Sequence, residues 1–343
     1  MSNNRLLTTI VTALLFVVTV FGTAVGQSTC KRLMKQDSTL NNLIDPLGYQ
    51  TSPLGTLGGV IKSGVGNKAI IFIPGLGFGG AVFDDFTPSF APDYRTYAVT
   101  LAGFGGTSAP PCPAESVSFG AQTWTNSALA GIEKLIADEH LSDIVVVGHW
   151  MTGTQLAVRL AINHPDKVKG VILLTGAPRF NVTDTNYAKF YDTYEKRIAT
   201  MDKFMGARWF KFVTRETWDD NNYYPTDYAV HPVMGLRLWR EAARPPLHVW
   251  VRYLCEFESQ DLTRDIGKLK VPTLILNPGY EGLWVDGSNN YMVESFGYKA
   301  WGNTLDGLTN ITIKTIPESR ACMWVDQPGA VADAMNSFLA GLK

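Results

Sequence analysis

Short apolar segments rich in β-branched residues recur along the chain, separated by turns that carry glycine and proline. They predict seven strands, in TLGGVIKSG, KAIIFIPG, YRTYAVTLAG, DIVVVGH, KGVILLTGAP, PTLILNPG and ITIKTIP. Between several of them, apolar positions three and four apart predict helices, as in GAVFDDFTPSF and AQTWTNSALAGIEKLIADEHL. Continuous apolar strands are buried on both faces. The predicted fold class is therefore α/β, with a mostly parallel central sheet and helices on both faces.

From about Phe180 to Phe257 this alternation of strands and helices stops. The stretch holds 17 of the 39 aromatic residues, in helix-like segments such as YAKFYDTYEKRIATMDKFMGARWFKFV. We expect a helical, aromatic-rich lid over residues 180–262, inserted between two parts of one core at 27–179 and 263–343. The aromatic side chains either form the lid's own core or line an apolar pocket beneath it, and the sequence leaves both open.

The first 26 residues have the order of a secretory signal peptide. An apolar run over residues 6–21 is followed by small residues at Ala24 and Gly26, which favours cleavage before Gln27. The alternative is an uncleaved membrane anchor, because the apolar stretch is nearly long enough to span a bilayer. We expect a secreted or periplasmic protein.

Composition narrows the class of partner. The chain has 343 residues, 45% of them hydrophobic, and a formal net charge of −1 without long runs of one sign. This balance favours a small neutral ligand and gives no indication of nucleic acid or of an anionic membrane surface. The five histidines are scattered and there is no CxxC motif, so no metal and no cofactor is expected.

Export would make the four cysteines candidates for disulfide bonds. Three full pairings are possible. We favour Cys30 with Cys112, because both lie in loop-like segments that carry serine or proline.

Five motifs in order resemble the α/β-hydrolase superfamily, from about residue 55 to the C-terminus. IPGLGFGG with VFDD resembles the oxyanion loop, and TLAGFGGTSAP the glycine turn after the next strand. GHWMTGTQLAVRLAINHPDKVKGVILL resembles the nucleophile elbow, its helix and the following strand. LTRDIGKLKVPTLIL resembles the return from the lid, and SRACMWVDQP the loop that holds the catalytic histidine in this superfamily. The resemblance implies an exported member of the superfamily with a degenerate triad.

The elbow motif lacks its nucleophile. In the pattern small–x–nucleophile–x–small the nucleophile position is Trp150 and the second small position is Thr152, although Gly148 and Gly153 are present. An indole cannot attack an acyl carbon. Thr152 and Thr154 are poor substitutes, because past the corner their hydroxyls are expected to point into the helix.

The other two triad positions are also changed. The base position is Ala321, which transfers no proton, and the acid position is Thr175 or falls near Glu281. Glu281 is either a retained acid or a surface residue. Because the triad works as a unit, we expect no ordinary serine-hydrolase activity.

Backbone groups survive such substitutions. The resemblance implies oxyanion-type N–H donors at Leu76 and Met151, and we expect Phe78, Trp150 and Met151 to line an apolar ligand pocket.

Three hypotheses of different class follow. The first is a non-catalytic exported protein that binds a small apolar ligand under its lid. The second is an enzyme with relocated chemistry, a lyase, isomerase or cyclase with a base such as His149, Glu281 or His231, or with residual hydrolase activity. The third is a module that binds another protein. We expect the first, with His149 packed structurally and Cys322 a buried inert thiol.

Overall fold

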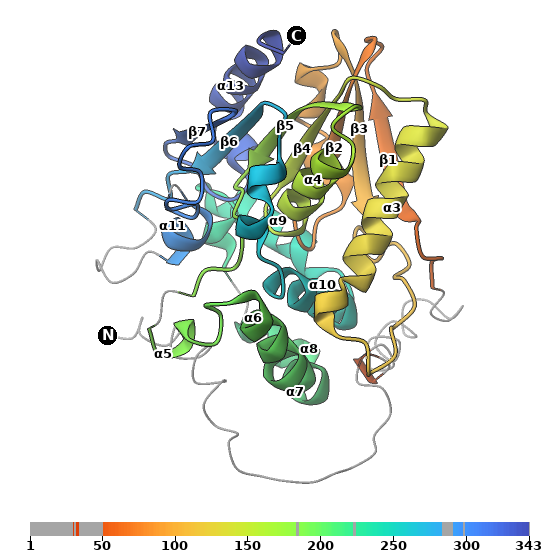
Figure 1. Ribbon diagram of the computed structural model, residues 1–343, viewed down its shortest axis with the longest axis vertical. Helices are drawn as coiled ribbons and strands as arrows, with labels where there is room; N and C mark the ends of the chain where they lie inside the picture. Colours follow the sequence, from red (N-terminus) through yellow and green to blue (C-terminus); the bar gives the residue numbers. More distant parts are fainter. Residues whose placement is uncertain are drawn as a thin grey trace.

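A computed structural model describes residues 30, 32–33, 51–182, 185–221, 224–282, 291–297 and 299–342. Its centre is a seven-stranded sheet with the strand order β1-β3-β2-β4-β5-β6-β7 (Figure 1). The strands are β1 (Leu57–Ser63), β2 (Lys68–Ile73), β3 (Tyr94–Leu101), β4 (Ile144–His149), β5 (Val168–Leu174), β6 (Thr273–Pro278) and β7 (Ile311–Ile316). Only β1 pairs antiparallel, with β3; every other neighbouring pair among these strands is parallel. The predicted fold class is confirmed, and each of the seven predicted strands forms.

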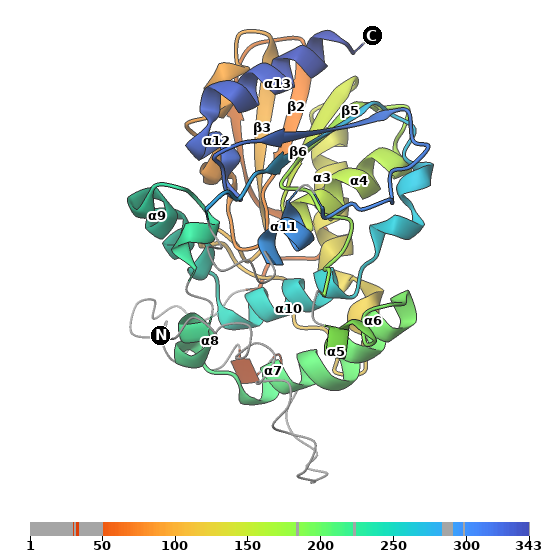
Figure 2. The ribbon, with the colours of Figure 1, turned by 90° about the vertical axis from the view of Figure 1, so that its left-hand side faces the viewer.

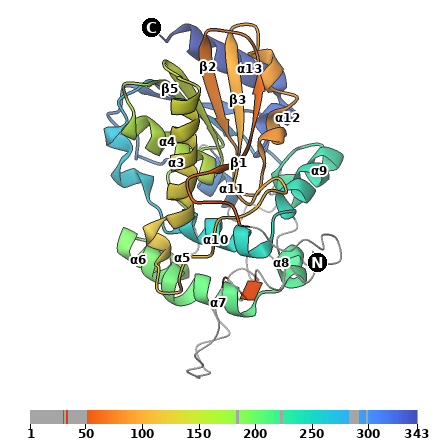
Figure 3. The same cartoon turned by 90° about the vertical axis from the view of Figure 1, so that its right-hand side faces the viewer.

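Helices cover both faces of the sheet. Helices α3 (Thr123–Asp138) and α4 (Thr152–Asn163) lie on one face, and α12 (Met323–Asp326) and α13 (Pro328–Ala340) on the other (Figures 2 and 3). Strands β4 and β5 are buried almost throughout, as expected of strands covered on both sides. The segment GAVFDDFTPSF departs from its prediction of one helix, because it forms two short 3₁₀ helices, η1 (Gly80–Phe83) and η2 (Thr87–Ser89).

A set of helices is inserted between β5 and β6. Helices α5 to α8 lie together beyond one end of the sheet with α10 between them and the sheet, and α9 lies to one side (Figures 1 and 2). The elements are α5 (Thr185–Ala188), α6 (Tyr194–Thr200), η4 (Met201–Met205), α7 (Gly206–Phe212), α8 (Arg215–Asn221), η5 (Pro225–Asp227), α9 (Pro232–Ala243) and α10 (Leu247–Glu258). We refer to residues 180–262 as the insertion.

Short helices complete the chain. These are η3 (Phe119–Ala121), η6 (Leu262–Arg264), η7 (Ile266–Lys268) and α11 (Tyr291–Phe296). In the parts of the chain that the structure describes, no helix is long and apolar enough to cross a membrane. The expected signal segment, residues 1–26, lies outside the described residues.

One disulfide bond joins Cys30 to Cys112, with a sulfur–sulfur distance of 2.15 Å. This is the pairing that the sequence favoured. Cys255 and Cys322 are free and buried. Burial raises the pKa of the Cys322 thiol well above its ordinary value, so the thiol is protonated near neutral pH, as expected of an inert cysteine.

Candidate functional site

A sharp turn after β4 forms the centre of the candidate site. Trp150 and Met151 both adopt positive φ, 39° and 43°. The Trp150 N–H donates to the Leu174 carbonyl at 2.9 Å, and the Trp150 carbonyl accepts from the Gly153 N–H at 3.0 Å. Positive φ is costly for a bulky residue, so the surrounding chain must impose this turn.

Two glycines allow the turn to pack. A Cβ atom on Gly148 would overlap the Gly153 carbonyl oxygen, and a Cβ atom on Gly153 would overlap the Ile73 carbonyl oxygen. The backbones of β2, β4 and α4 therefore approach each other closely here. The turn keeps the close packing of an elbow although its central residue is a tryptophan.

The residue at the base position, Ala321, is held by its backbone. Its carbonyl accepts from the Thr175 hydroxyl at 2.7 Å and lies 3.0 Å from His149 Nε2. Its N–H donates to the Asp227 carbonyl at 3.0 Å. Thr175 and Ala321 thus lie in direct contact, and both are fully buried. Neither side chain can exchange a proton with a substrate near neutral pH.

His149, one of the alternative bases, is held in a packing role. Its Nδ1 accepts the Gly75 N–H at 3.2 Å, which leaves Nε2 to carry the proton and donate to Ala321. Burial lowers the pKa of His149 to about 3, despite the opposing effect of the Ala321 hydrogen bond. The ring is therefore neutral and both of its nitrogens are occupied.

The remaining alternative bases lie on the surface. Glu281 is exposed, and its Oε2 accepts the Glu318 N–H at 2.8 Å. His231 is exposed at the start of α9. The structure therefore does not bring Glu281 together with Thr175 and Ala321.

Aromatic rings surround Trp150. Its ring centroid lies 5.7 Å from that of Tyr228, in the insertion, and 5.6 Å from that of Phe296 in α11, both in edge-to-face geometry. Phe78 is buried against Tyr228, at 5.7 Å between centroids, and Met151 is also buried. The residues expected to line an apolar pocket thus lie in a tightly packed aromatic layer.

Several buried polar atoms without partners belong to described residues at or just after the carboxyl ends of β4 and β6. In the described structure, five buried side-chain atoms here have no hydrogen-bond partner: Trp150 Nε1, Thr152 Oγ1, Thr154 Oγ1, Asn277 Oδ1 and Tyr280 Oη. Buried polar atoms are normally paired, because an unpaired one costs about 1–3 kcal/mol. Such a cluster is typical of a place where a substrate or water supplies the missing partners.

The two expected backbone donors border this cluster. Leu76 is fully buried in the loop after β2, and Gly75 beside it packs against Trp150 Cβ. Among the described residues, neither the Leu76 N–H nor the Met151 N–H donates to a backbone carbonyl. Both N–H groups are thus available to a carbonyl oxygen placed at the elbow.

Sequence reasoning did not identify Asp227. This half-buried residue ends η5, and its carbonyl binds the Ala321 N–H. Burial raises the pKa of the Asp227 carboxyl to about 7, with Arg320 acting in the opposite direction. Its charge in turn raises the pKa values of Tyr228 and Tyr280, for which burial is the main cause. A carboxyl group with this pKa is suited to acid–base catalysis near neutral pH.

Comparisons with known proteins fit the observed fold. Residues 70–334 match the family described as "Alpha/beta hydrolase family". The pimeloyl-[acyl-carrier protein] methyl ester esterase of Legionella pneumophila (strain Paris) is 29% identical over 155 residues, which is 43% of this chain and 57% of that protein. The protein of the same name from Yersinia enterocolitica is 24% identical over 121 residues, 35% of this chain and 41% of that protein. The chain spans about half the length of these curated relatives.

Solved structures share the fold at low sequence identity. An esterase from Exiguobacterium antarcticum has a TM-score of 0.59 at 14% identity and covers 82% of this chain and 95% of its own. A bromoperoxidase from Bacillus anthracis has a TM-score of 0.59 at 16% sequence identity, and the match covers 82% of this chain and 94% of the bromoperoxidase. MenH from S. aureus has a TM-score of 0.56 at 16% sequence identity, and the match covers 82% of this chain and 97% of MenH. These likenesses show the fold alone.

The expectation of a non-catalytic binding protein is wrong. It is overturned by the curated relatives that match part of the chain, which are named as pimeloyl-[acyl-carrier protein] methyl ester esterases. Loss of the serine nucleophile does not by itself exclude catalysis by another group. No local motif marks Asp227, whose backbone carbonyl accepts the Ala321 N–H and whose carboxyl has a pKa raised to about 7.

Proposed function

Because the chain belongs to the alpha/beta hydrolase family, we propose that it is an enzyme that hydrolyses a small apolar ester, or a related carbonyl compound, with a degenerate triad and no acyl-enzyme. One observation carries the proposal. Among the described residues, five buried polar atoms without partners lie at or just after the carboxyl ends of β4 and β6: the Nε1 of Trp150 itself, two hydroxyls at the start of α4, Asn277 Oδ1 and Tyr280 Oη. A substrate group or a reacting water would satisfy them, and ligands bind at this edge of open α/β sheets.

In the proposed reaction, backbone N–H groups bind the substrate carbonyl and a carboxylate transfers the proton. The substrate carbonyl accepts from the N–H groups of Leu76 and Met151. Asp227, in its ionised form, takes a proton from a water molecule whose oxygen attacks the carbonyl carbon. The tetrahedral oxyanion then collapses and expels the alcohol oxygen, which takes the proton back from Asp227. The products are a carboxylic acid and an alcohol, and Asp227 returns to its starting state.

The apolar part of the substrate would lie against Phe78, Trp150 and Met151. All three are buried under the insertion side of the sheet, and Tyr228 of the insertion packs on Trp150. We therefore assign the insertion the role of a lid that excludes water. The curated relatives contribute only the type of bond, an ester, because the chain spans about half of their length.

A test compares turnover with covalent labelling. The purified chain is assayed on methyl and p-nitrophenyl esters of increasing acyl length, and the same samples are treated with a fluorophosphonate probe. We expect turnover without labelling, and a rate that rises with pH through about 7 as Asp227 ionises. Asp227→Asn should lower kcat/KM by roughly 10²–10⁴-fold, the usual contribution of a general base.

The matched control is Asp333→Asn, which changes an exposed aspartate on α13. It should leave both turnover and its pH profile unchanged. Stoichiometric fluorophosphonate labelling, or full activity in Asp227→Asn, would overturn the proposed mechanism.

A second reaction uses the same parts. Proton removal next to a carbonyl needs a base and an oxyanion site but no nucleophile, which matches a turn that carries Trp150. In that case Asp227 would remove the proton, and the N–H groups of Leu76 and Met151 would hold the enolate. Exchange of substrate C–H for deuterium in D₂O, followed by NMR without ester cleavage, identifies this reaction.

We also propose that the protein is exported. The disulfide between Cys30 and Cys112 supports this, because such bonds persist in oxidising compartments. The leader-like residues 1–26 point the same way. Intact-mass measurement of the secreted protein should give a chain that begins at Gln27. Recovery of the full-length chain in the membrane fraction would favour an anchor instead.

A further inference from the structure

A polar pocket lies away from the elbow, where the insertion meets the core. Its volume is about 280 Å³, and it is lined by the start of α3, by Arg159 of α4, by Tyr194 of α6 and by the segment that follows α10. Arg159 follows Thr152 by seven residues, which corresponds to roughly 10 Å along a helix. The pocket is therefore separate from the site proposed for ester hydrolysis.

One wall of the pocket is a buried amide with a fixed orientation. Gln122 is only 4% exposed, and its Nε2 donates to the carbonyls of Phe119 at 3.1 Å and Glu256 at 2.6 Å. Two carbonyl acceptors require the NH₂ group on that side, so the other atom is Oε1. In the described structure Gln122 Oε1 has no partner. It is an unused acceptor that a ligand O–H or N–H group would satisfy.

A second wall presents an unused cation. Arg159 donates through Nη2 to Asn126 Oδ1, whereas its buried Nη1 has no partner among the described residues. Arg264, which also lines the pocket, lies over the Tyr194 ring at 4.3 Å from the centroid. No ion pair within the described chain includes Arg159 or Arg264. Neither guanidinium group is in direct contact with a carboxylate of the described residues, although the charges of Glu256, Glu133 and Asp265 act on Arg159 from farther away.

The acidic residues of the pocket are already engaged. Asp261 Oδ2 pairs with Arg179 at 2.9 Å, while its Oδ1 accepts from Thr263. Asp265 pairs with Lys268 at 2.6 Å. The unsatisfied capacity of the pocket is thus two cationic donors and one neutral acceptor.

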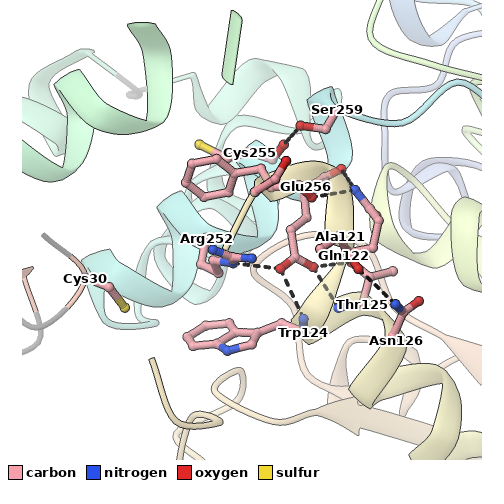
Figure 4. Close-up of polar contacts among 12 residues, drawn as sticks. Cys30, Ala121, Gln122, Trp124, Thr125, Asn126, Arg252, Cys255, Glu256 and Ser259 are labelled. Atoms are coloured by element: carbon pink, nitrogen blue, oxygen red, sulfur yellow. Dashed lines mark hydrogen bonds and ion pairs between the residues drawn. The ribbon is translucent and has the colours of Figure 1, made fainter. Parts of the chain in front are cut away.

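A buried network next to Gln122 holds the start of α3 in place (Figure 4). The Glu256 carboxylate accepts from the backbone N–H groups of Trp124 at 3.1 Å and Thr125 at 2.8 Å, and Arg252 Nε donates to it at 2.6 Å. Glu256 therefore already occupies the N-terminus of α3, and a ligand would not bind there. The same network holds the backbone around Gln122 in place before any ligand arrives.

We propose that this pocket binds a small polyhydroxy acid. The ligand carboxylate pairs with Arg159 and Arg264, and a ligand hydroxyl donates to Gln122 Oε1. Such a ligand supplies each group that the pocket lacks, and charge-assisted hydrogen bonds to guanidinium are the strong ones. By contacting Tyr194 as well, it would join the insertion to helices α3 and α4.

Three six-carbon probes separate the contributions. Gluconate carries a carboxylate and hydroxyls, hexanoate only the carboxylate, and sorbitol only the hydroxyls. Isothermal titration of the purified chain should show gluconate bound more tightly than either of the others by roughly tenfold or more, the worth of one charge-assisted hydrogen bond. Equal affinity for the three probes, or no binding of gluconate, overturns the proposal.

Variants locate the binding. Arg159→Gln and Arg264→Gln should each weaken gluconate binding by roughly tenfold, whereas Arg240→Gln, an exposed arginine on α9, should not. Circular dichroism melting checks that the variants fold. Arg264 is exposed, so Arg264→Gln decides the question if Arg159→Gln unfolds. Unchanged gluconate affinity in a folded Arg264→Gln places the binding elsewhere and overturns the proposal, whatever the outcome of the ester assays.

Discussion

The two ends of α4 differ in what they leave unsatisfied. At its start, the elbow is enclosed by aromatic rings, and its unpaired atoms are neutral: an indole N–H and the hydroxyls of Thr152 and Thr154. Toward its end, Arg159 presents a cation beside the buried Gln122 amide. The two ends of one helix thus border an apolar, neutral environment and a polar, charged one.

The difference shows how the family fold can change its chemistry. The backbone of the elbow keeps its geometry because Gly148 and Gly153 are required by close packing, whatever the side chain at position 150. Side-chain chemistry is not constrained in that way. We infer that proton transfer moved to the insertion, through Asp227, while the scaffold stayed in place.

The largest expected effect is at the polar end. Glu256→Ala would leave Arg252 as an uncompensated buried charge and remove the acceptor for the first N–H groups of α3. We expect a loss of about 3–5 kcal/mol in the free energy of unfolding, measured by urea denaturation. Glu133→Ala, at a pair with His164 in which each side chain is about one-third exposed, is the control and should cost less than about 1 kcal/mol. Equal losses in the two variants would mean that the network in Figure 4 carries no special stability.

The stability contributed near the elbow should depend more on pH than the stability contributed at the polar end of α4. The pKa of Asp227 is raised from 3.8 to about 7 in the folded chain, so the unfolded chain ionises first as the pH rises. Its contribution to stability is therefore complete below pH about 4 and is lost as the pH rises through about 7. Asp227→Asn should flatten this part of the profile, followed as Tm against pH. An unchanged profile would show that Asp227 titrates normally.

A smaller effect is expected for Trp150→Phe. The change removes an unpaired buried N–H, which favours the variant, and part of a buried ring, which opposes it. We expect the free energy of unfolding to change by less than about 1 kcal/mol. A loss of several kcal/mol would indicate that the indole N–H has a partner in solution, such as a bound water.

The smallest effect is expected at the last turn of α4. His164 lies 2.8 Å from Glu133 Oε1, and both side chains are about one-third exposed. His164→Ala should change the free energy of unfolding by a few tenths of a kcal/mol, since exposed pairs contribute little. Urea denaturation at pH 6 and pH 8 checks this. A loss above about 1 kcal/mol in the free energy of unfolding would mean that the His164–Glu133 pair stabilises the end of α4 more than an exposed pair should.

The sequence predicts the strands and helices of the fold better than it predicts which residues come together at the candidate sites. The seven strands can be predicted because strands buried on both faces need continuous apolar runs, such as Val145 to Val147. Position 150 could also be placed at the turn, since Gly148 and Gly153 mark it. The strand order and the two 3₁₀ turns at residues 80–89 were not predictable in the same way.

The contacts at the two candidate sites join distant segments. Asp227 meets Ala321 across 94 residues, and Gln122 meets Glu256 across 134. No local pattern marks either pair, because each side chain takes its role from neighbours brought together by the sheet order and by the path of the insertion. The raised pKa of Asp227 likewise depends on burial, which its surrounding residues PTDY do not encode.

The Cys30–Cys112 bond closes a loop of 82 residues that contains the first three strands. In the chain-entropy model, a cross-link of this span disfavours the unfolded chain by about 4–5 kcal/mol. Thioredoxin or glutathione would remove that contribution in a reducing compartment. The free energy of unfolding of the same polypeptide would then depend on the redox state of its surroundings. Chains in which the disulfide has not formed would unfold more readily and would be degraded first by proteases.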